Sequence, residues 1–488
     1  MIPFADYEPD SDSFEAAHVA KNVLPGKNCY FPMPSTVRYS TSALPSRYMG
    51  GTFVRSQAGV AYNFVGTAAK LYRLNGLGFT EMTRSSGGDY SVAADDRWEF
   101  VLWGNQLLAL NIADDIQVVT LGGANFAALS GSPPKAKHAA IFSDDFVMLG
   151  NIVDAVDGAQ HSRVHWCAYR DITDWTPDTE TQCDFRDLEA TDGAVQRLIG
   201  GENGLAFQDR RISHVSLIGS PYVFQFARLT NGIGTNAPRS VVTRGQDVFF
   251  LGQEGFAVMA GGTQYQRIGE NRVDRTFFND IKPDHYSSIV GVAQKKTGRI
   301  WWAYAGSGSS NGIPNKQLIY DPSLNKWSSG DLVLEGFQFA AASGIDSDSI
   351  DATYANSDLA NIPMDSDLWA GGIEEFASFD AQHYLQFHNG PPLPAELETA
   401  EVELYRGRHA WVNEARPIGE AFNSILLQVM SRDARALGSS ITPNKSLNSY
   451  GVFDLNANAV YHKFVCQVTG QWDRMLGLDV VAKQGEYR

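Results

Sequence analysis

The sequence has few cysteines and no long hydrophobic run. Its 488 residues include four cysteines, Cys29, Cys167, Cys183 and Cys466, and no C-x-x-C pair. Neither a disulfide framework nor a zinc knuckle or thioredoxin-like site is therefore expected. No uninterrupted apolar stretch approaches the ~18 residues of a membrane span, and the N-terminus lacks a secretion signal. We expect buried thiols and a chain that is synthesised as a soluble cytoplasmic product.

Positive charge is also scarce. Lys and Arg number 39 against 55 Asp and Glu, which gives a formal net charge of −16. Before the C-terminal region, the basic doublets are limited to Arg210-Arg211 and Lys295-Lys296. Each phosphate neutralised by Lys or Arg adds salt-sensitive affinity for nucleic acid. The charge therefore excludes a broad DNA-gripping surface, and no positive stripe interleaved with aromatics predicts sequence-specific binding.

The commonest catalytic signatures are missing. The Gly26-Lys27 pair lacks the upstream glycines of a P-loop, and the glycines at 76–78 and 232–234 lack the third glycine of a dinucleotide fingerprint. Neither H-E-x-x-H nor G-x-S-x-G occurs. We expect a protein that is not an enzyme and that has neither catalytic residues nor a cofactor.

What is present is typical of a large, turn-rich β protein. Aromatics make up 11%, glycines number 46 and prolines 20, while charged residues reach only 19% against a typical ~25%. From residue 46 onward, short aromatic and β-branched runs end at glycine, as strands entering turns do. Such runs occupy residues 60–66, 98–104, 146–150, 248–252 and 300–306.

The spacing of these runs predicts a β-propeller. The closing glycines at 66, 104 and 150 are 38 and 46 residues apart, close to the ~40–50 residues of a four-stranded blade. Residues 318–327 are similar to a kelch-type blade ending, in which Trp327 would pack between blades. We predict about six blades over residues 46–342, with a β-sandwich carrying irregular loops as the alternative.

Other regions flank the expected propeller. Residues 1–45 form a proline-punctuated extended arm that would pack along a partner or across its own domain. Residues 343–395 hold an Asp-rich insertion and the propeller closure. Residues 396–488 predict a C-terminal antiparallel β domain resembling a sandwich, with strands at 399–405, 424–430, 459–468 and 476–482. One short helix is expected at 273–281, before Pro283.

Two groups of residues are weak metal candidates. Asp346, Asp348 and Asp351 supply oxygen ligands that suit calcium but lack the glycine and distal Glu of an EF-hand; a solvated acidic loop is the alternative. His161, His165 and Cys167 would share one face of a strand, so that a metal cluster with a fourth ligand from elsewhere is geometrically conceivable. Packing against neighbouring blades is the favoured interpretation, and we predict no metal site.

Carbohydrate chemistry is a second alternative. Adjacent carboxylates occur at Asp95-Asp96, Asp114-Asp115, Asp144-Asp145 and Glu374-Glu375. Glycosidases need two carboxyls at a set separation across a cleft, which sequence adjacency does not supply. A carbohydrate-binding or glycan-cleaving propeller in host-surface recognition would instead present Trp301-Trp302 as a stacking platform, although burial between blades is the favoured interpretation of this pair.

Short segments along nearly the whole chain carry a resemblance to one family. They are the residues at 1–4 (MIPF), 7–10 (YEPD), 19–26 (VAKNVLPG), 70–74 (KLYRL), 171–177 (DITDWTP), 200–202 (GGE), 249–251 (FFL), 268–269 (IG), 273–278 (VDRTFF), 314–327 and 390–393 (GPPL). In these segments the chain resembles the tail nozzle, or packaged-DNA stabilisation, family of short-tailed bacteriophages (podoviruses) and related prophages.

The resemblance implies a structural virion protein of the phage tail. It implies a homo-oligomeric, hexameric ring below the portal and adaptor that continues the DNA ejection channel and helps to retain packaged DNA. Tail fibre, spike or needle proteins are further implied partners, with no membrane span and no sequence-specific DNA binding. A negatively charged lumen would repel the DNA backbone and keep its exit fast. A generic cytoplasmic scaffold propeller is the remaining alternative.

Overall fold

Nearly every regular element of the protein is a β-strand. The computed structural model describes residues 1–57, 59–341, 374–421, 424–434 and 438–487. Its helices in these ranges are one α-helix and three short 3-10 turns: α1 (Asp274–Asp280), η1 (Ala190–Asp192), η2 (Pro238–Ser240) and η3 (Pro283–Ser288). None of these described helices combines the length and apolar character that a membrane crossing needs.

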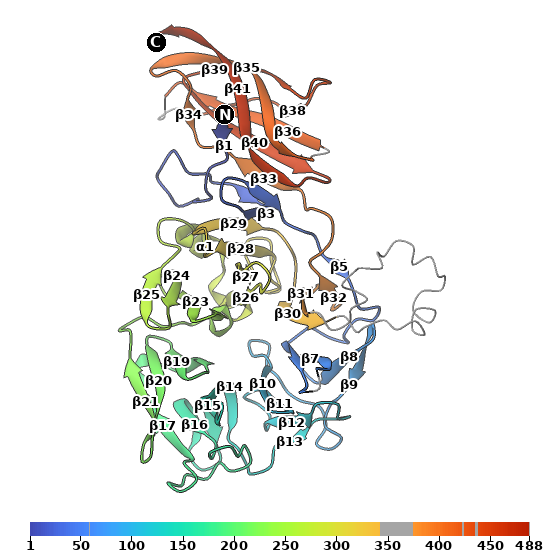
Figure 1. Cartoon of the computed structure of the whole chain (residues 1–488), viewed down its shortest axis with the longest axis vertical. Coiled ribbons are helices and arrows are strands. Elements are labelled where there is room, and N and C mark those ends of the chain that lie inside the picture. Colours follow the sequence, from blue (N-terminus) through green and yellow to red (C-terminus); the bar gives the residue numbers. More distant parts are fainter. Residues whose placement is uncertain (58, 342–373, 422–423, 435–437, 488) are drawn as a thin grey trace, which may run out of the picture.

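Seven four-stranded antiparallel units, called blades 1 to 7, occupy most of the described chain (Figure 1). Blade 1 contains β6 (Gly51–Arg55), β7 (Ala61–Gly66), β8 (Leu71–Asn75) and β9 (Gly78–Glu81). Blade 2 contains β10 (Glu99–Trp103), β11 (Gln106–Leu110), β12 (Gln117–Thr120) and β13 (Ala127–Ala128). Blade 3 contains β14 (Lys135–Phe142), β15 (Phe146–Asp154), β16 (Gly158–Trp166) and β17 (Asp184–Asp187).

Blades 4 to 7 continue the same order, except that the last strand of blade 7 comes from the N-terminal region. Blade 4 contains β18 (Val195–Ile199), β19 (Asn203–Gln208), β20 (Ile212–Gly219) and β21 (Val223–Arg228), and blade 5 contains β22 (Val242–Arg244), β23 (Asp247–Gly252), β24 (Gly255–Ala260) and β25 (Gln264–Arg267). Blade 6 contains β26 (Val290–Ala293), β27 (Ile300–Tyr304), β28 (Lys316–Asp321) and β29 (Lys326–Gly330). Blade 7 contains β30 (Gly336–Ala341), β31 (Glu374–Phe379), β32 (Leu385–Phe387) and β5 (Val37–Arg38).

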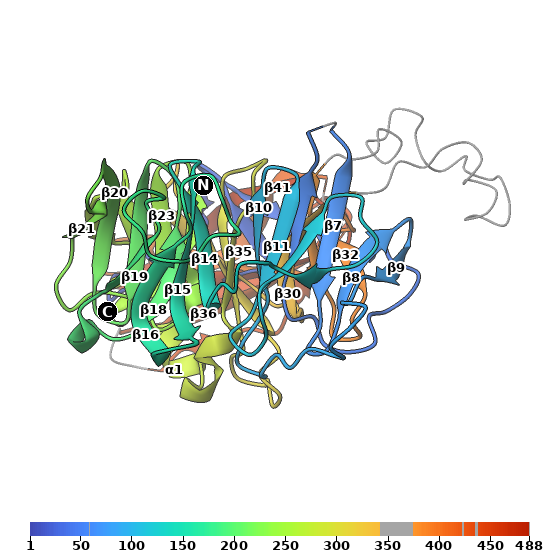
Figure 2. The ribbon, with the colours of Figure 1, turned by 90° about the horizontal axis from the view of Figure 1, so that it is seen from below.

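The blades close into a ring around a central axis. The first strands contact one another between blades 1 and 2, 2 and 3, 3 and 4, 5 and 6, 6 and 7, and 7 and 1. The turn η2, just before β22 of blade 5, contacts both β18 of blade 4 and β26 of blade 6. Seen from the side, the strands of the blades stand roughly upright (Figure 2). Strand β23 is apolar after Asp247, and its residues Val248–Gly252 are all buried, as expected where adjacent blades cover both faces of a strand.

Blade 7 joins the two ends of the propeller. Its outer strand, β5, pairs with β32 through Val37 and Phe387, so residues near the N-terminus complete the last blade. The mostly-β propeller predicted from the sequence is confirmed, but the described residues hold seven blades where about six were expected. Blade 7 could not be counted from the spacing of the strand-like runs, because it is assembled from segments that are distant in sequence.

A two-sheet sandwich stands beside the ring (Figure 1). Its first sheet contains β3 (Val23–Pro25), β4 (Tyr30–Pro32), β41 (Arg474–Tyr487), β35 (Arg408–Glu420) and β39 (Phe453–Ala459), with β1 (Ile2–Pro3) also on β41. Its second sheet contains β2 (Ala20–Lys21), β33 (Ala395–Glu398), β40 (Tyr461–Thr469), β36 (Ser424–Arg432) and β37 (Ser440–Ile441), with β34 (Val402–Glu403) on β40 and β38 (Lys445–Ser446) on β36.

The expected N-terminal arm connects this sandwich to the propeller. Strand β2 pairs in parallel with β29 of blade 6 and antiparallel with β33, so one eleven-stranded sheet runs from the blade into the sandwich. One hydrophobic core follows the same path: Trp302 and Trp327 of the blade belong to the same buried cluster as Phe464 of the sandwich.

Local expectations from the sequence also match the structure. The helix expected at 273–281 is α1, with Phe277 buried. Trp327 is fully buried, packs on Trp302 and on Phe256 of blade 5, and donates its indole N–H to the carbonyl of Ile268 at 3.1 Å. It therefore packs between blades, as the kelch-like ending predicted.

Candidate functional site

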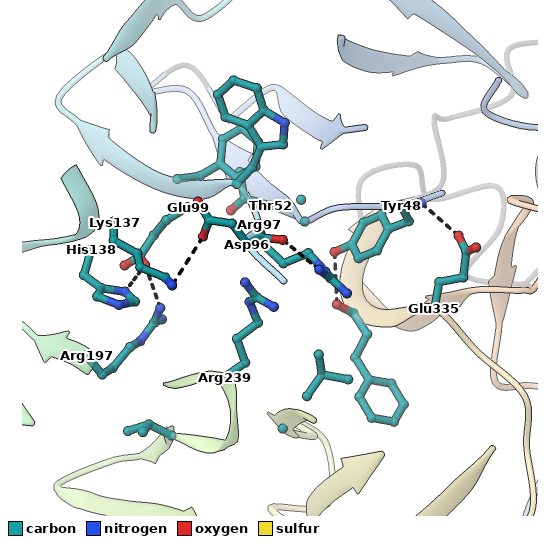
Figure 3. A pocket seen from close by; sticks show the side chains of 18 residues that line it. Tyr48, Thr52, Asp96, Arg97, Glu99, Lys137, His138, Arg197, Arg239 and Glu335 are labelled. Atoms are coloured by element: carbon teal, nitrogen blue, oxygen red, sulfur yellow. Dashed lines mark hydrogen bonds and ion pairs between the residues drawn. The ribbon is translucent and has the colours of Figure 1, made fainter. Parts of the chain in front are cut away.

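The candidate site is the central channel of the propeller, a cavity of about 310 Å³ on the ring axis. Each of the seven blades contributes to its wall from its first strand or from the residues just before that strand. The charged lining residues are Asp96, Arg97, Glu99, Lys137, Arg197, Arg239 and Glu335 (Figure 3). Four cations thus face three carboxylates, in a chain whose net charge is −16.

Glu99 at the start of β10 is the most heavily engaged carboxylate. Its Oε2 lies 2.9 Å from Nη1 of Arg197 and 3.1 Å from Nδ1 of His138 (Figure 3). Burial alone would raise the pKa of Glu99, but Arg197 and His138 hold it below its ordinary value. Burial lowers the pKa of His138 despite the neighbouring carboxylate. The pair is therefore an ionised Glu99 beside a neutral His138.

The other two carboxylates of the wall also have partners. Asp96 lies 4.0 Å from Nζ of Lys137. Glu335 accepts the backbone N–H of Tyr48 at 2.8 Å and lies 2.9 Å from Nδ1 of His383. Burial raises the pKa of Glu335 above its ordinary value, since these contacts offset only part of its desolvation.

Arg97 has no such partner. Its side chain is only 6% exposed, and its Nη1 donates to two backbone carbonyls, those of Ala94 at 2.8 Å and Asp96 at 2.7 Å. Among the described residues, no carboxylate lies within 4.0 Å of its guanidinium. Burial, and then the nearby charge of Arg47, lower the pKa of Arg97 to about 10.

Arg239 in η2 is the second unpaired guanidinium. It points into the middle of the channel, between Arg197 and Arg97, without a dashed line to either (Figure 3). Its one hydrogen bond within the described chain is a long one, from Nη1 to the carbonyl of Ser287 at 3.3 Å. Loss of hydration, and then the charge of Arg97, lower the pKa of Arg239 to about 9. Neither guanidinium has a described carboxylate within 4.0 Å, although Asp96, Glu99 and Glu335 counter part of these shifts from farther away.

Comparisons with known proteins give no family. No family model matches the chain, and no curated protein matches it. Among solved structures, a WD40 domain of Pan2 from Neurospora crassa is similar with a TM-score of 0.40 at 7% identity, over 75% of this chain and 97% of that one. A fungal alcohol oxidase of the AA5 family gives a TM-score of 0.42 at 10% identity, over 91% and 99%.

A further similar structure is the extracellular domain of a one-component system from B. thetaiotaomicron. Its TM-score is 0.43 at 9% identity, over 80% of this chain and 44% of that one. This chain therefore spans less than half the length of that domain. Similarity at this level carries no inference about function.

The residues proposed as a His/His/Cys cluster are each engaged separately. His161 Nδ1 is paired with Asn151 Oδ1 at 3.0 Å, and His165 Nε2 with the carbonyl of Trp175 at 3.1 Å. Cys167 accepts the backbone N–H of Val147 and is buried, which raises the pKa of its thiol. Within the ranges that the structure describes, no three His, Cys, Asp or Glu side chains are grouped as metal ligands. The calcium candidates Asp346, Asp348 and Asp351 lie outside the described residues.

The adjacent carboxylates are spread over blades 2, 3 and 7. Asp114 pairs with Arg84, Asp145 with Arg170 and Glu374 with Lys295. Only Asp96 reaches the central channel. The proposed stacking platform is buried: Trp301 and Trp302 are 1% and 0% exposed, so neither can present its ring to a sugar.

The arginines of the channel were not predicted from the sequence. Their common feature is position: Arg97, Lys137, Arg197 and Arg239 each lie on, or within a few residues before, the first strand of a blade. Aligning the blades on their first strands would have brought these residues together. The irregular blade spacing, which varies with the loops, concealed that alignment.

Proposed function

We propose that the chain is a structural subunit of a phage tail nozzle, which works by assembling into a ring and not by catalysis. The supporting observation is the eleven-stranded sheet that runs from blade 6 through β2 into the sandwich. Because strand pairing and a shared core join the two parts, they form one body that can transmit load along a tube wall. The segments that resemble the nozzle family lie on both sides of this junction.

In this proposal the DNA conduit is the lumen between subunits, and the acidic surface keeps DNA from adhering to it. The central channel carries more cations than carboxylates, so the excess of acidic residues behind the net charge of −16 lies outside its lining. Negative walls repel the phosphate backbone and leave no counterion-release gain for binding.

The direct test is the mass of the purified protein, alone and with a portal–adaptor complex, by mass photometry and negative-stain electron microscopy. We expect hexameric rings, or rings that form on the adaptor. A chain that stays monomeric in both conditions contradicts the proposal.

Retention of duplex DNA is a second readout. At ~0.15 M salt we expect no retention of DNA by the assembled ring. Tight binding under these conditions would contradict an acidic, non-adhesive lumen. A glycan array tests the carbohydrate-binding alternative, which predicts saturable binding by the monomer.

A further inference from the structure

Two arginines in the central channel form no ion pair with a described carboxylate, and the more distant Asp96, Glu99 and Glu335 offset only part of their loss of hydration. Arg97 is buried and bonded only to backbone carbonyls, and Arg239 makes a single long bond to the carbonyl of Ser287. Placing unpaired like charges near each other in a partly desolvated space is unfavourable. Such an arrangement persists in a folded protein when a ligand or a structural contact offsets its cost.

The carboxylates of the channel are not available to offset the rest of this cost. Glu99 is held by Arg197 and His138, and Glu335 by the backbone of Tyr48. Asp96 faces Lys137 at 4.0 Å, and its other oxygen accepts the N–H of Ile112. Each carboxylate is therefore fixed on the wall, while both unpaired guanidiniums face the cavity (Figure 3).

We propose that the central channel binds a small oxyanion with at least two negative charges, held between Arg97 and Arg239. Guanidinium forks bind phosphate and carboxylate groups in a bidentate manner, and these bonds are stronger than those between neutral groups. A cavity of about 310 Å³ accommodates a group of pyrophosphate or citrate size. Lys137 adds a third cation at the rim of the same space.

The lowered pKa values support the same site. Burial and the neighbouring Arg47 lower the pKa of Arg97, and burial together with Arg97 lowers that of Arg239. A bound anion would restore the ordinary preference of both groups for the charged form. This inference is independent of ring assembly, because the site lies within one propeller and its readout is ligand binding.

The test is titration of the full chain with sodium pyrophosphate and, separately, sodium citrate, by isothermal calorimetry and thermal unfolding at matched ionic strength. We expect saturable binding and a rise in the unfolding temperature that depends on ligand concentration. Preference for pyrophosphate or for citrate identifies the phosphate or carboxylate source. No saturable binding of either anion up to about a thousandfold excess over protein overturns the proposal.

Two variants locate the site. Arg239→Gln removes one guanidinium fork, and we expect affinity to fall about tenfold to a hundredfold, the usual effect of losing a hydrogen bond to a charged group. Arg210→Gln removes the same charge from an exposed position and should bind like the original protein. Equal affinity in all three proteins would place the anion elsewhere and overturn the proposal.

The unfolding temperature of the unliganded Arg239→Gln variant shows whether the substitution causes a folding defect. Because Arg239→Gln relieves repulsion with Arg97 and gives up one long hydrogen bond, we expect the unliganded variant to unfold at the same or a higher temperature than the original protein. A folded variant that no longer responds to the anion supports the site. A variant that is destabilised without ligand would show that Arg239 is a structural residue, against the proposal.

Discussion

At the scale of single residues, this protein places several ionisable groups where water cannot reach them freely. Asp274 at the start of α1 is a clear case. Its carboxylate packs so closely against Gly255 and Gly269 that a Cβ on either glycine would lie about 2 Å from it. It accepts the backbone N–H of Phe256 at 3.0 Å, while Nη2 of Arg267 is 3.8 Å away. Burial outweighs both contacts and raises the pKa of Asp274 to about 6.

This shift predicts a pH dependence of stability. Between the ordinary pKa of 3.8 and about 6 the folded protein holds a proton that the unfolded chain releases, so Asp274 makes stability fall as the pH rises through this interval. Asp274→Asn keeps an acceptor oxygen but carries no ionisable group. We therefore expect the free energy of unfolding of the variant, relative to that of the original protein, to increase by up to about 3 kcal/mol between pH 4 and pH 7.

Urea unfolding at pH 4, 5, 6 and 7 measures this difference. Asp284→Asn is the matched control, since Asp284 is exposed and its substitution should shift no midpoint by more than about 0.5 kcal/mol. A stability difference between Asp274→Asn and the original protein that stays constant with pH would contradict the assignment.

At the scale of elements, the N-terminal segment contributes side chains that finish structures formed by other parts of the chain. The helix α1 has no side-chain cap of its own at Val273. Asp10 supplies one across the fold: its carboxylate accepts the backbone N–H groups of Arg275 at 2.5 Å and Thr276 at 2.8 Å. These are N–H groups that the helix itself leaves without acceptors.

Removing this cap should loosen α1 and its attachment to the arm. We expect Asp10→Ala to cost about 1–2 kcal/mol of stability, the range typical of N-cap replacements. Amide exchange at the start of α1 should accelerate, as measured by hydrogen–deuterium exchange and mass spectrometry. Asp12→Ala, an exposed site two residues away, is the control and should leave both properties unchanged. Unaltered exchange in Asp10→Ala would mean that Asp10 does not cap the helix.

At the scale of the whole molecule, the propeller and the sandwich are joined through one short strand. Asn22 follows β2 and bonds to both parts: its Nδ2 donates to the carbonyl of Pro394 at 2.8 Å, and its Oδ1 accepts the N–H of Asp331 at 2.8 Å. Its φ of 56° lies in the left-handed region. Since the sheet and the core are continuous here, the two parts should not unfold independently.

We therefore expect one unfolding transition for the entire chain, with coincident midpoints from tryptophan fluorescence and far-UV circular dichroism in urea. Asn22→Ala should lower the midpoint, because it loses both buried hydrogen bonds and places alanine in a left-handed conformation at ~1–2 kcal/mol. Asn22→Gly removes the same bonds without that steric cost and should be less destabilised. Two separated transitions in the original protein would contradict the shared-core interpretation.

The parts of the fold that follow local patterns could be predicted from the sequence. Aromatic runs ending at glycine marked strands of blades 1, 2, 3, 5 and 6, and the strand at 459–468 corresponds closely to β40, with Phe464 and Cys466 facing inward. Pairings across the whole chain, such as β5 with β32, have no local signal. The channel site could not be predicted for the same reason. No local sequence pattern marks Arg97 or Arg239, and only ring closure brings them together.

The pairing of the first strands with the last has a consequence for synthesis on the ribosome. Ile2 pairs with Leu478 in β41. At roughly 5–20 residues per second, the N-terminal strands wait roughly 20 to 90 s for this partner to be translated. Until then β1 and β4 lack β41 as their pairing strand, and β5 lacks β32 for most of that time. The nascent chain therefore exposes unpaired strand edges until β41 has been translated.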